Sequence, residues 1–308
     1  MDVLTLVNRT KEDRKMTKTL PLTADGSWLS KYALAMAGLT FGLMALGSAT
    51  RVMNAGLSCP DWPLCYGAVI PAAQMNLQVF LEWFHRLVAS GTGLLTLAFA
   101  GLAWWYRQSL PRWVPWSGVL AVTIVVWQGI LGGLTVTELL RFDIVTAHLG
   151  TGMAFFATWI TIGLAMQPSS SFDGAKNLTI VALVATVLVY GQSILGALVA
   201  SQWALHQCLA NTDLCQVMHN HLWGVLPATI GVSLIPIWVW RTPTAPPLVH
   251  SLAKTIVWLL VAQILLGVGT YQLHLEVETL TVMHQSVAAA LLGSCLAVTI
   301  LAGKGIKQ

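Results

Sequence analysis

The chain has 308 residues, of which 56% are hydrophobic and only 9% are charged. With a mean hydropathy of +0.71, it has too little polar surface to cover a soluble globule. The composition therefore excludes an ordinary soluble domain and predicts a polytopic membrane protein. The formal net charge of +4 does not require a nucleic-acid partner, because most positive side chains gather in loops on one side of the predicted membrane.

The N-terminal segment 1–31 is polar and contains six of the 16 lysines and arginines. It lacks the apolar core and cleavage site of a secretory signal, so we expect residues 1–31 to form a retained cytoplasmic tail. Apolar runs of about 20 residues follow, each long enough to cross a bilayer as a helix. They predict an all-α integral membrane protein with eight transmembrane helices, at 32–52, 79–104, 115–137, 144–166, 178–202, 216–240, 252–273 and 279–302.

The positive charges predict how these helices are oriented. Most lysines and arginines outside the helices lie in the two terminal segments and in the loops after the second, fourth and sixth helices, whereas the opposite loops keep only Arg51 and Arg141. The positive-inside rule therefore places both termini in the cytoplasm. The tail contains acidic residues, which mitochondrial transit peptides avoid, so we expect a multi-pass protein of a bacterial-type plasma membrane.

The sequence repeats itself, which predicts two related halves. Residues 126–133 of the third helix resemble 261–268 of the seventh, and residues 190–196 of the fifth resemble 41–47 of the first. Glycines in such repeats are typical of close helix packing. We expect two pseudo-symmetric four-helix bundles of parallel topology, spanning residues 32–166 and 178–302.

Four histidines repeat with the halves. The separation along the chain between His85 and His219 is nearly the same as the separation between His148 and His284. Each half thus carries a histidine on its second and its fourth helix. All four lie roughly 3 to 7 residues from the outer ends of their helices, which is about 5 to 10 Å at the rise of an α-helix.

Paired imidazoles in a helical bundle favour haem. A neutral histidine nitrogen binds iron well, and a porphyrin buries its apolar faces between helices. Zinc or copper would need three or four close ligands, and no cysteine or second histidine lies four residues away within the predicted helices. The remaining alternative is that each histidine is hydrogen-bonded to a neighbouring helix.

The second predicted helix carries Glu82, His85 and Arg86 near its start, and ionisable residues there mark a functional site because burying them is costly. Glu82 and His85 are three residues apart and share one helix face, so Glu82 could handle protons beside a centre bound by His85. Arg86 could pair with a haem propionate, as could Arg51 or Arg141. The alternative is an interfacial cluster that extends toward the lipid headgroups.

The sixth predicted helix offers two histidines, and only one of them can face the bundle because residues two apart point to different faces. His219 is favoured because Gln216 precedes it by three residues, as Glu82 precedes His85, and His221 is the alternative. In this register a carboxylate in the first half is matched by an amide in the second. This difference predicts one reactive site and one electron-handling site.

Four cysteines lie in the outer loops, where an oxidising compartment permits disulfides. Four cysteines allow three connectivities, and proximity favours Cys59 with Cys65 and Cys208 with Cys215. These bridges would hold the loops over the site, or they could exchange reducing equivalents.

The motifs resemble those of the heme A synthase family in order and spacing, over residues 32 to 302. They are Glu82-x-x-His85-Arg86, Ala147-His148-Leu149-Gly150, Gln216-x-x-His219, His284-Gln285 and the outer-loop cysteine pairs. The resemblance implies that the C-terminal half holds haem b as a cofactor, with iron ligands at His219 (or His221) and His284. It also implies that His85 and His148 flank the substrate, haem O, and that Glu82 is the essential acidic residue.

The reaction implied by the resemblance is oxidation of a methyl group of haem O to a formyl group through two successive hydroxylations, which gives haem A. Expected partners are the membrane lipid, a haem O synthase, an electron donor such as quinol or a thiol reductant, and a second copy of the chain in a homo-oligomer. Two other functions fit the histidines: a di-haem b-type electron-transfer cytochrome, and a haem-carrying assembly factor.

Overall fold

The computed structural model describes residues 24–168, 170–200, 213–273 and 276–306. Within these ranges the chain forms eight long helices and one 3-10 turn, η1 (Ala72–Gln74), and no strand. The helices are α2 (Ala24–Val52), α3 (Leu77–Trp105), α4 (Trp113–Thr137), α5 (Phe142–Ala165), α6 (Ala175–Ala200), α8 (Asp213–Trp240), α9 (Pro247–Gln272) and α10 (Glu278–Lys304). All eight are long and apolar enough to cross a membrane, so the predicted eight-helix membrane protein is confirmed.

The helix ends differ most from the prediction at α2. This helix begins at Ala24, whereas the apolar run predicts a start at residue 32, within the expected tail. Polar residues such as Lys31 do not stop a helix, and the charge-free stretch that defines a membrane span can be shorter than the helix that contains it. Residues 1–23 of the expected tail lie outside the described residues.

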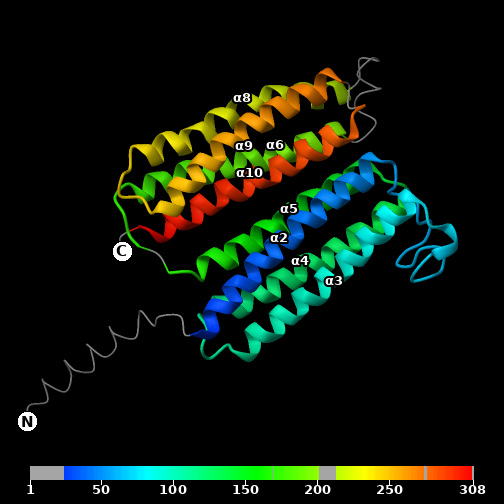
Figure 1. Cartoon of the computed structure of the whole chain (residues 1–308), viewed down its shortest axis with the longest axis horizontal. Helices are drawn as coiled ribbons and strands as arrows, with labels where there is room; N and C mark the ends of the chain where they lie inside the picture. Colours follow the sequence, from blue (N-terminus) through cyan, green and yellow to red (C-terminus); the bar gives the residue numbers. More distant parts are fainter. Residues whose placement is uncertain (1–23, 169, 201–212, 274–275, 307–308) are drawn as a thin grey trace, which may run out of the picture.

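The contacts between helices divide them into two groups of four, which lie side by side in Figure 1. In the first group α2 packs against α3 and α5, and α4 packs against the same two helices. In the second group α10 packs against α6 and α9, and α8 packs against the same two. The groups meet where α2 and α5 contact α10, and where α5 contacts α6. Each bundle is therefore a closed square, with its first and third helices on one diagonal and its second and fourth on the other.

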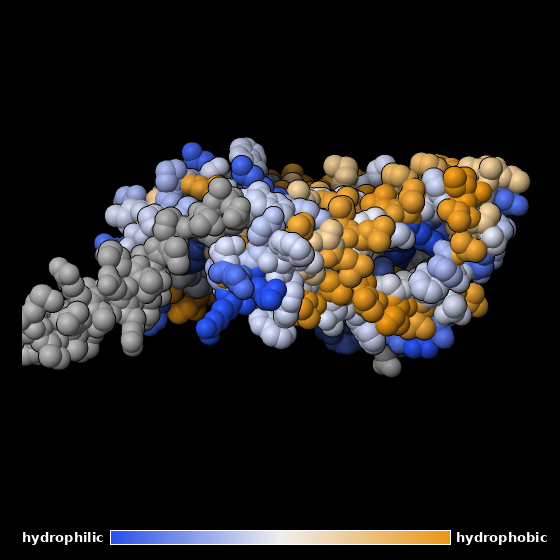
Figure 2. Space-filling view, turned by 90° about the horizontal axis from the view of Figure 1, so that it is seen from below, coloured by the Kyte–Doolittle hydropathy of each residue, from blue (hydrophilic) through white to orange (hydrophobic). Residues whose placement is uncertain are grey.

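Apolar residues fill the bundles and also cover their outer faces. In the first bundle Trp159 and Phe99 are fully buried, and their rings meet edge to face at 5.0 Å. Large side chains such as Leu94 and Trp105 are instead exposed, and Figure 2 shows a broad hydrophobic patch on one face of the molecule. Exposed apolar surface on this scale is expected of helices that face lipid.

Replacing Trp159 tests this packing, because the helices have no hydrophobic driving force from water and depend on close contact. We expect Trp159→Ala to leave a cavity and to lower the free energy of unfolding by about 3–5 kcal/mol. Thermal unfolding of the purified chain in detergent measures this loss. Trp105→Ala, at a position that is 80% exposed, is the matched control and should unfold near the parent temperature. Equal unfolding temperatures for the two variants would contradict the packing described.

Candidate functional site

Four imidazole rings pack directly against glycines of a neighbouring helix. A Cβ atom added to Gly47, on α2, would lie only 2.9 Å from Cε1 of His85, on α3. The corresponding distance is 3.0 Å from Gly196, on α6, to His221, on α8. Real Cβ atoms essentially never lie as close to another atom as 2.9 Å, and 3.0 Å is tighter than nine in ten real Cβ contacts, so a side chain at either position would press on the ring.

The same arrangement recurs on the other side of each bundle. A Cβ on Gly132 of α4 would lie 3.5 Å from Cε1 of His148, on α5, and one on Gly267 of α9 would lie 3.0 Å from Cε1 of His284, on α10. In both bundles the histidines thus occupy one diagonal of the square and their glycines the other.

Glutamines four residues before three of these glycines reach the same histidines. Nε2 of Gln192 donates to the backbone carbonyl of His221 at 2.5 Å and lies 3.1 Å from its Nδ1. Nε2 of Gln128 donates to the carbonyl of His148 at 2.9 Å, and Nε2 of Gln263 lies 3.3 Å from Nε2 of His284.

The fourth equivalent position is an exception, because it is Leu43, four residues before Gly47. His85 is therefore held by packing alone on this side. Its Nδ1 is buried and has no hydrogen-bond partner among the described residues, and the same is true of Nδ1 in His148 and His284. Buried nitrogens without partners are costly, which indicates that a ligand completes these sites.

The second bundle contains a cavity of about 380 Å³, a size typical of small-molecule and cofactor pockets. His221 and His284 both line it, together with Met218, Leu222 and many other apolar side chains, and no Asp or Glu is among the lining residues described. The chemistry of this lining suits a flat, largely apolar group with a metal that accepts nitrogen ligands.

His219 lies elsewhere. It is exposed and is not among the lining residues, while Gln216 is also exposed and donates to Asn220 at 3.0 Å. The geometry therefore favours His221 as the residue that faces the bundle. The spacing to Gln216 favours His219, with His221 as the alternative. The reason is the two-residue offset, which turns His219 to another helix face.

A better sequence signal for His221 exists. His221 follows His85 at the same separation along the chain as His284 follows His148. In this register Met218 corresponds to Glu82 and Leu222 to Arg86. The second bundle has apolar side chains where the first has an ion pair, so the difference between the halves is larger than a carboxylate replaced by an amide.

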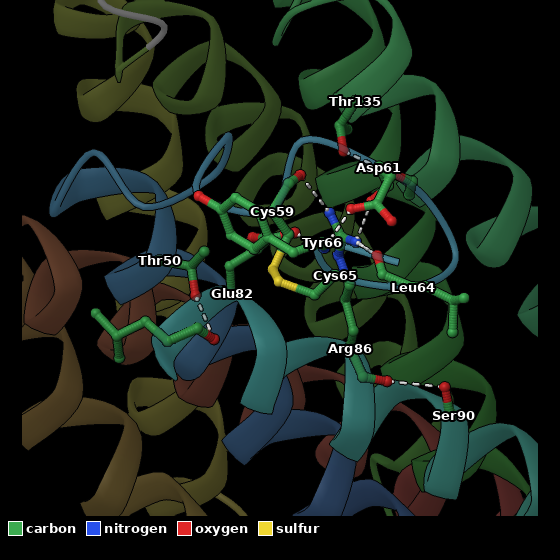
Figure 3. A network of polar contacts seen from close by, with 12 residues as sticks. Thr50, Cys59, Asp61, Leu64, Cys65, Tyr66, Glu82, Arg86, Ser90 and Thr135 are labelled. Atoms are coloured by element: carbon green, nitrogen blue, oxygen red, sulfur yellow. Dashed lines mark hydrogen bonds and ion pairs between the residues drawn. A yellow bond between two sulfur atoms is a disulfide. The ribbon is translucent and has the colours of Figure 1, made fainter. Parts of the chain in front are cut away.

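The ion pair of the first bundle links its helix to the outer loop. Glu82 is only 6% exposed, and its Oε1 accepts a hydrogen bond from Nε of Arg86 at 2.8 Å. Arg86 also donates to the carbonyls of Asp61 at 2.6 Å, Leu64 at 2.7 Å and Cys59 at 3.2 Å. Figure 3 shows this guanidinium beneath the loop. Arg86 thus already has four contacts within the protein, which leaves it little capacity to bind a propionate.

The outer loop is also held together internally. A disulfide joins Cys59 to Cys65, and both residues are buried. The carboxylate of Asp61 accepts hydrogen bonds from the backbone N–H groups of Tyr66 and Gly67, at 2.6 and 2.7 Å. The hydrogen bond from Gly67 is the main reason that the pKa of Asp61 lies below its ordinary value.

This loop also lies over the first bundle. The indole ring of Trp62 packs on Gly133 of α4, where an added Cβ would lie 3.3 Å from the ring. Gly133 adjoins Gly132, the glycine beneath His148, so the loop covers α4 beside the paired histidines. The other predicted disulfide, Cys208 with Cys215, involves residues whose side chains lie outside those the structure describes.

Other metal chemistry finds less support. In the parts of the chain that are described, no three side chains of His, Cys, Asp and Glu come together as ligands of an ion. The diagonal imidazole pairs are therefore the groups in these ranges that could hold a metal, and imidazole nitrogens are of the kind that would bind a haem iron.

The loop contacts give a direct prediction. Arg86→Gln should release the carbonyls of three loop residues, and hydrogen bonds to a charged group stabilise by about 1.5–3 kcal/mol each. We expect the buried disulfide to be reduced about tenfold faster or more by a membrane-impermeant phosphine, followed by alkylation and mass measurement. Arg141→Gln is the matched control, because among the described residues Arg141 forms ion pairs with the exposed Glu138 and Asp143 and not with the loop. An unchanged rate in the Arg86 variant would show that the guanidinium does not hold the loop.

Comparison with known proteins agrees with this architecture. The heme A synthase of Shewanella oneidensis is 27% identical over 86% of this chain and 93% of its own length. That of Rhizorhabdus wittichii is 26% identical over 87% of this chain and 92% of its own length. A protoheme IX farnesyltransferase of Halobacterium salinarum is 30% identical, but over only 45% of this chain and 32% of its own length.

The resemblance of the motifs to the heme A synthase family is thereby confirmed, and a family model supports it independently. The model described as cytochrome oxidase assembly protein, COX15-CtaA, matches residues 30–296. Because that match covers most of the sequence, including all four histidines that pack on glycines, the chain belongs to the COX15-CtaA family of cytochrome oxidase assembly proteins.

Proposed function

We propose that the chain is a heme A synthase, an oxidoreductase that converts a methyl group of haem O to a formyl group and supplies haem A for assembly of terminal oxidases. The observation that carries the proposal is the pair of equivalent histidine sites, of which only one has a buried carboxylate beside it. Family membership and two heme A synthases that align over nearly their whole length support it.

In this proposal the second bundle holds the cofactor, haem b, between His221 and His284. Gln192 lies against Nδ1 of His221 and Gln263 against Nε2 of His284. The other nitrogen of each ring makes no hydrogen bond to the described residues. The lining, which includes Met218 and Leu222, is mostly apolar and suits the faces of a porphyrin. When bound, haem b supplies reversible one-electron chemistry, which suits a relay site.

The first bundle holds the substrate between His85 and His148. Glu82 lies one helical turn before His85 on the same face, so its carboxylate can accept or deliver a proton at the outer end of this site. Arg86 compensates the charge of Glu82 and keeps the loop with Trp62 over α4. A closed loop would exclude water from the oxidation site.

The alternative function is a di-haem cytochrome that only transfers electrons. It gives no reason for Glu82 and Arg86 in one bundle and Met218 and Leu222 in the other, because two permanent haems would suit similar surroundings. The asymmetry therefore favours the enzyme over the electron-transfer cytochrome. For the same reason it favours the enzyme over a haem-carrying assembly factor.

The orientation and partners are also part of the proposal. The loop at residues 53–76 and the described C-terminal end lie at opposite ends of the bundles (Figure 1), and the distribution of lysines and arginines supports cytoplasmic termini. The histidine sites then lie toward the outer side. A haem O synthase would supply the substrate in this proposal.

The two histidines of α8 provide a sharp test of the cofactor site. We expect His221→Ala to lose the low-spin haem b spectrum, because an axial ligand is removed. His219→Ala is the matched control and should keep both the spectrum and the haem b content. Optical spectra and haem-to-protein ratios of the purified chains measure this. Loss of the spectrum only in the His219 variant would show that His219, and not His221, binds the haem b iron.

Glu82 tests the oxidation itself. In a host that supplies haem O, Glu82→Ala and Glu82→Gln should both retain haem b but produce no haem A, since neither side chain can accept and release a proton as a carboxylate does. Glutamine can still accept a hydrogen bond from Arg86, which alanine cannot. Haem A production by the glutamine variant alone would therefore assign Glu82 to holding the loop and would contradict its role in proton transfer.

A further inference from the structure

A positively charged side chain of the first bundle reaches the cavity of the second. Arg51 lies in the last turn of α2, yet it lines the same cavity as His221 and His284. It does so from across the junction between the bundles, along with Met44 of the same helix. The cavity of the second bundle is therefore completed by a cation that belongs to the first.

This cation differs from the other outer arginines. Arg86 is paired with Glu82, and Arg141 with Asp143, whereas no ion pair or side-chain hydrogen bond joins Arg51 to any described residue. A positive charge is favourable at a helix C-terminus. That effect explains why α2 tolerates Arg51, but it does not explain why the residue borders an apolar cavity.

An unpaired guanidinium beside an apolar cavity is expected to bind an anion from the group that fills it. The described lining contains no Asp or Glu, so none of the described residues offers Arg51 a carboxylate partner there. A carboxylate matches the planar donor fork of arginine through two parallel hydrogen bonds. A porphyrin with propionate groups is a flat apolar group with such carboxylates on one edge.

We propose that Arg51 binds a propionate of the haem in the second bundle and so connects the two sites. This rests on the proposed function, because it requires haem b between His221 and His284. Gly47, one turn earlier on α2, packs on His85. One helix therefore contacts the substrate histidine through Gly47 and the cofactor carboxylate through Arg51.

The electrostatic consequence is a change in reduction potential. A positive charge close to a propionate offsets its negative charge, and the reduced haem, with one electron more, gains from this. Arg51 should therefore raise the midpoint potential of haem b, and its removal should lower it.

The test compares haem b with haem b dimethyl ester, in which the carboxylates are blocked. The full chain, made without haem and loaded with either porphyrin, is mixed with excess apomyoglobin, and the rate of porphyrin loss is followed optically. We expect Arg51→Gln to lose haem b about ten- to a hundredfold faster than the parent chain, and to lose the ester at the parent rate. Its haem b should also titrate at a lower midpoint potential.

Two controls separate binding from structure. Arg51→Lys keeps the positive charge but lacks the planar donor fork. Its rate of haem b loss should rise less than that of Arg51→Gln, and its rate of ester loss should equal the parent rate. Arg141→Gln should change neither rate. Equal acceleration for haem b and its ester, or no acceleration with haem b in either Arg51 variant, would overturn the proposal. A parent chain that takes up no haem b would instead refute the proposed function on which it rests.

Discussion

The close approach of each imidazole to a glycine on the neighbouring helix is the contact on which both sites depend. It brings two histidines of each bundle onto one diagonal, with glycines such as Gly47 and Gly267 on the other. In a membrane the helices gain little from burying apolar surface, so packing contacts of this kind determine where side chains meet. A larger residue at Gly47 would displace the ring of His85, and one at Gly267 would press on the ring of His284.

Duplication gives the two sites one geometry, and a few differences give them separate roles. Gln192 holds the backbone of His221, whereas Leu43 occupies the equivalent place beside His85. The pair Glu82–Arg86 ties the first site to a covering loop, and the second site has Met218 and Leu222 instead. The additional hydrogen bond from Gln192 suits a cofactor that stays bound. The ion pair and the covering loop suit a substrate that must enter, react and leave.

The helices and the histidine pairs could be predicted because apolar length and residue spacing carry that information directly. The choice between His219 and His221 shows the limit. Matching the Gln216–His219 spacing to Glu82–His85 favours one helix face, whereas the equal separations of His85 from His221 and of His148 from His284 favour another. The contacts of Arg86 with loop carbonyls and of Arg51 with the opposite bundle could not be predicted. They depend on how distant segments meet in space, which residue type and spacing do not encode.

The most direct measurement is chromatography with mass detection of the haems extracted from the purified chain, produced in a host that makes haem O. We expect haem b together with haem A or a hydroxylated intermediate, because one site keeps its haem and the other oxidises it. Haem b alone, with unaltered haem O in the same membranes, would contradict the account and favour an electron-transfer cytochrome.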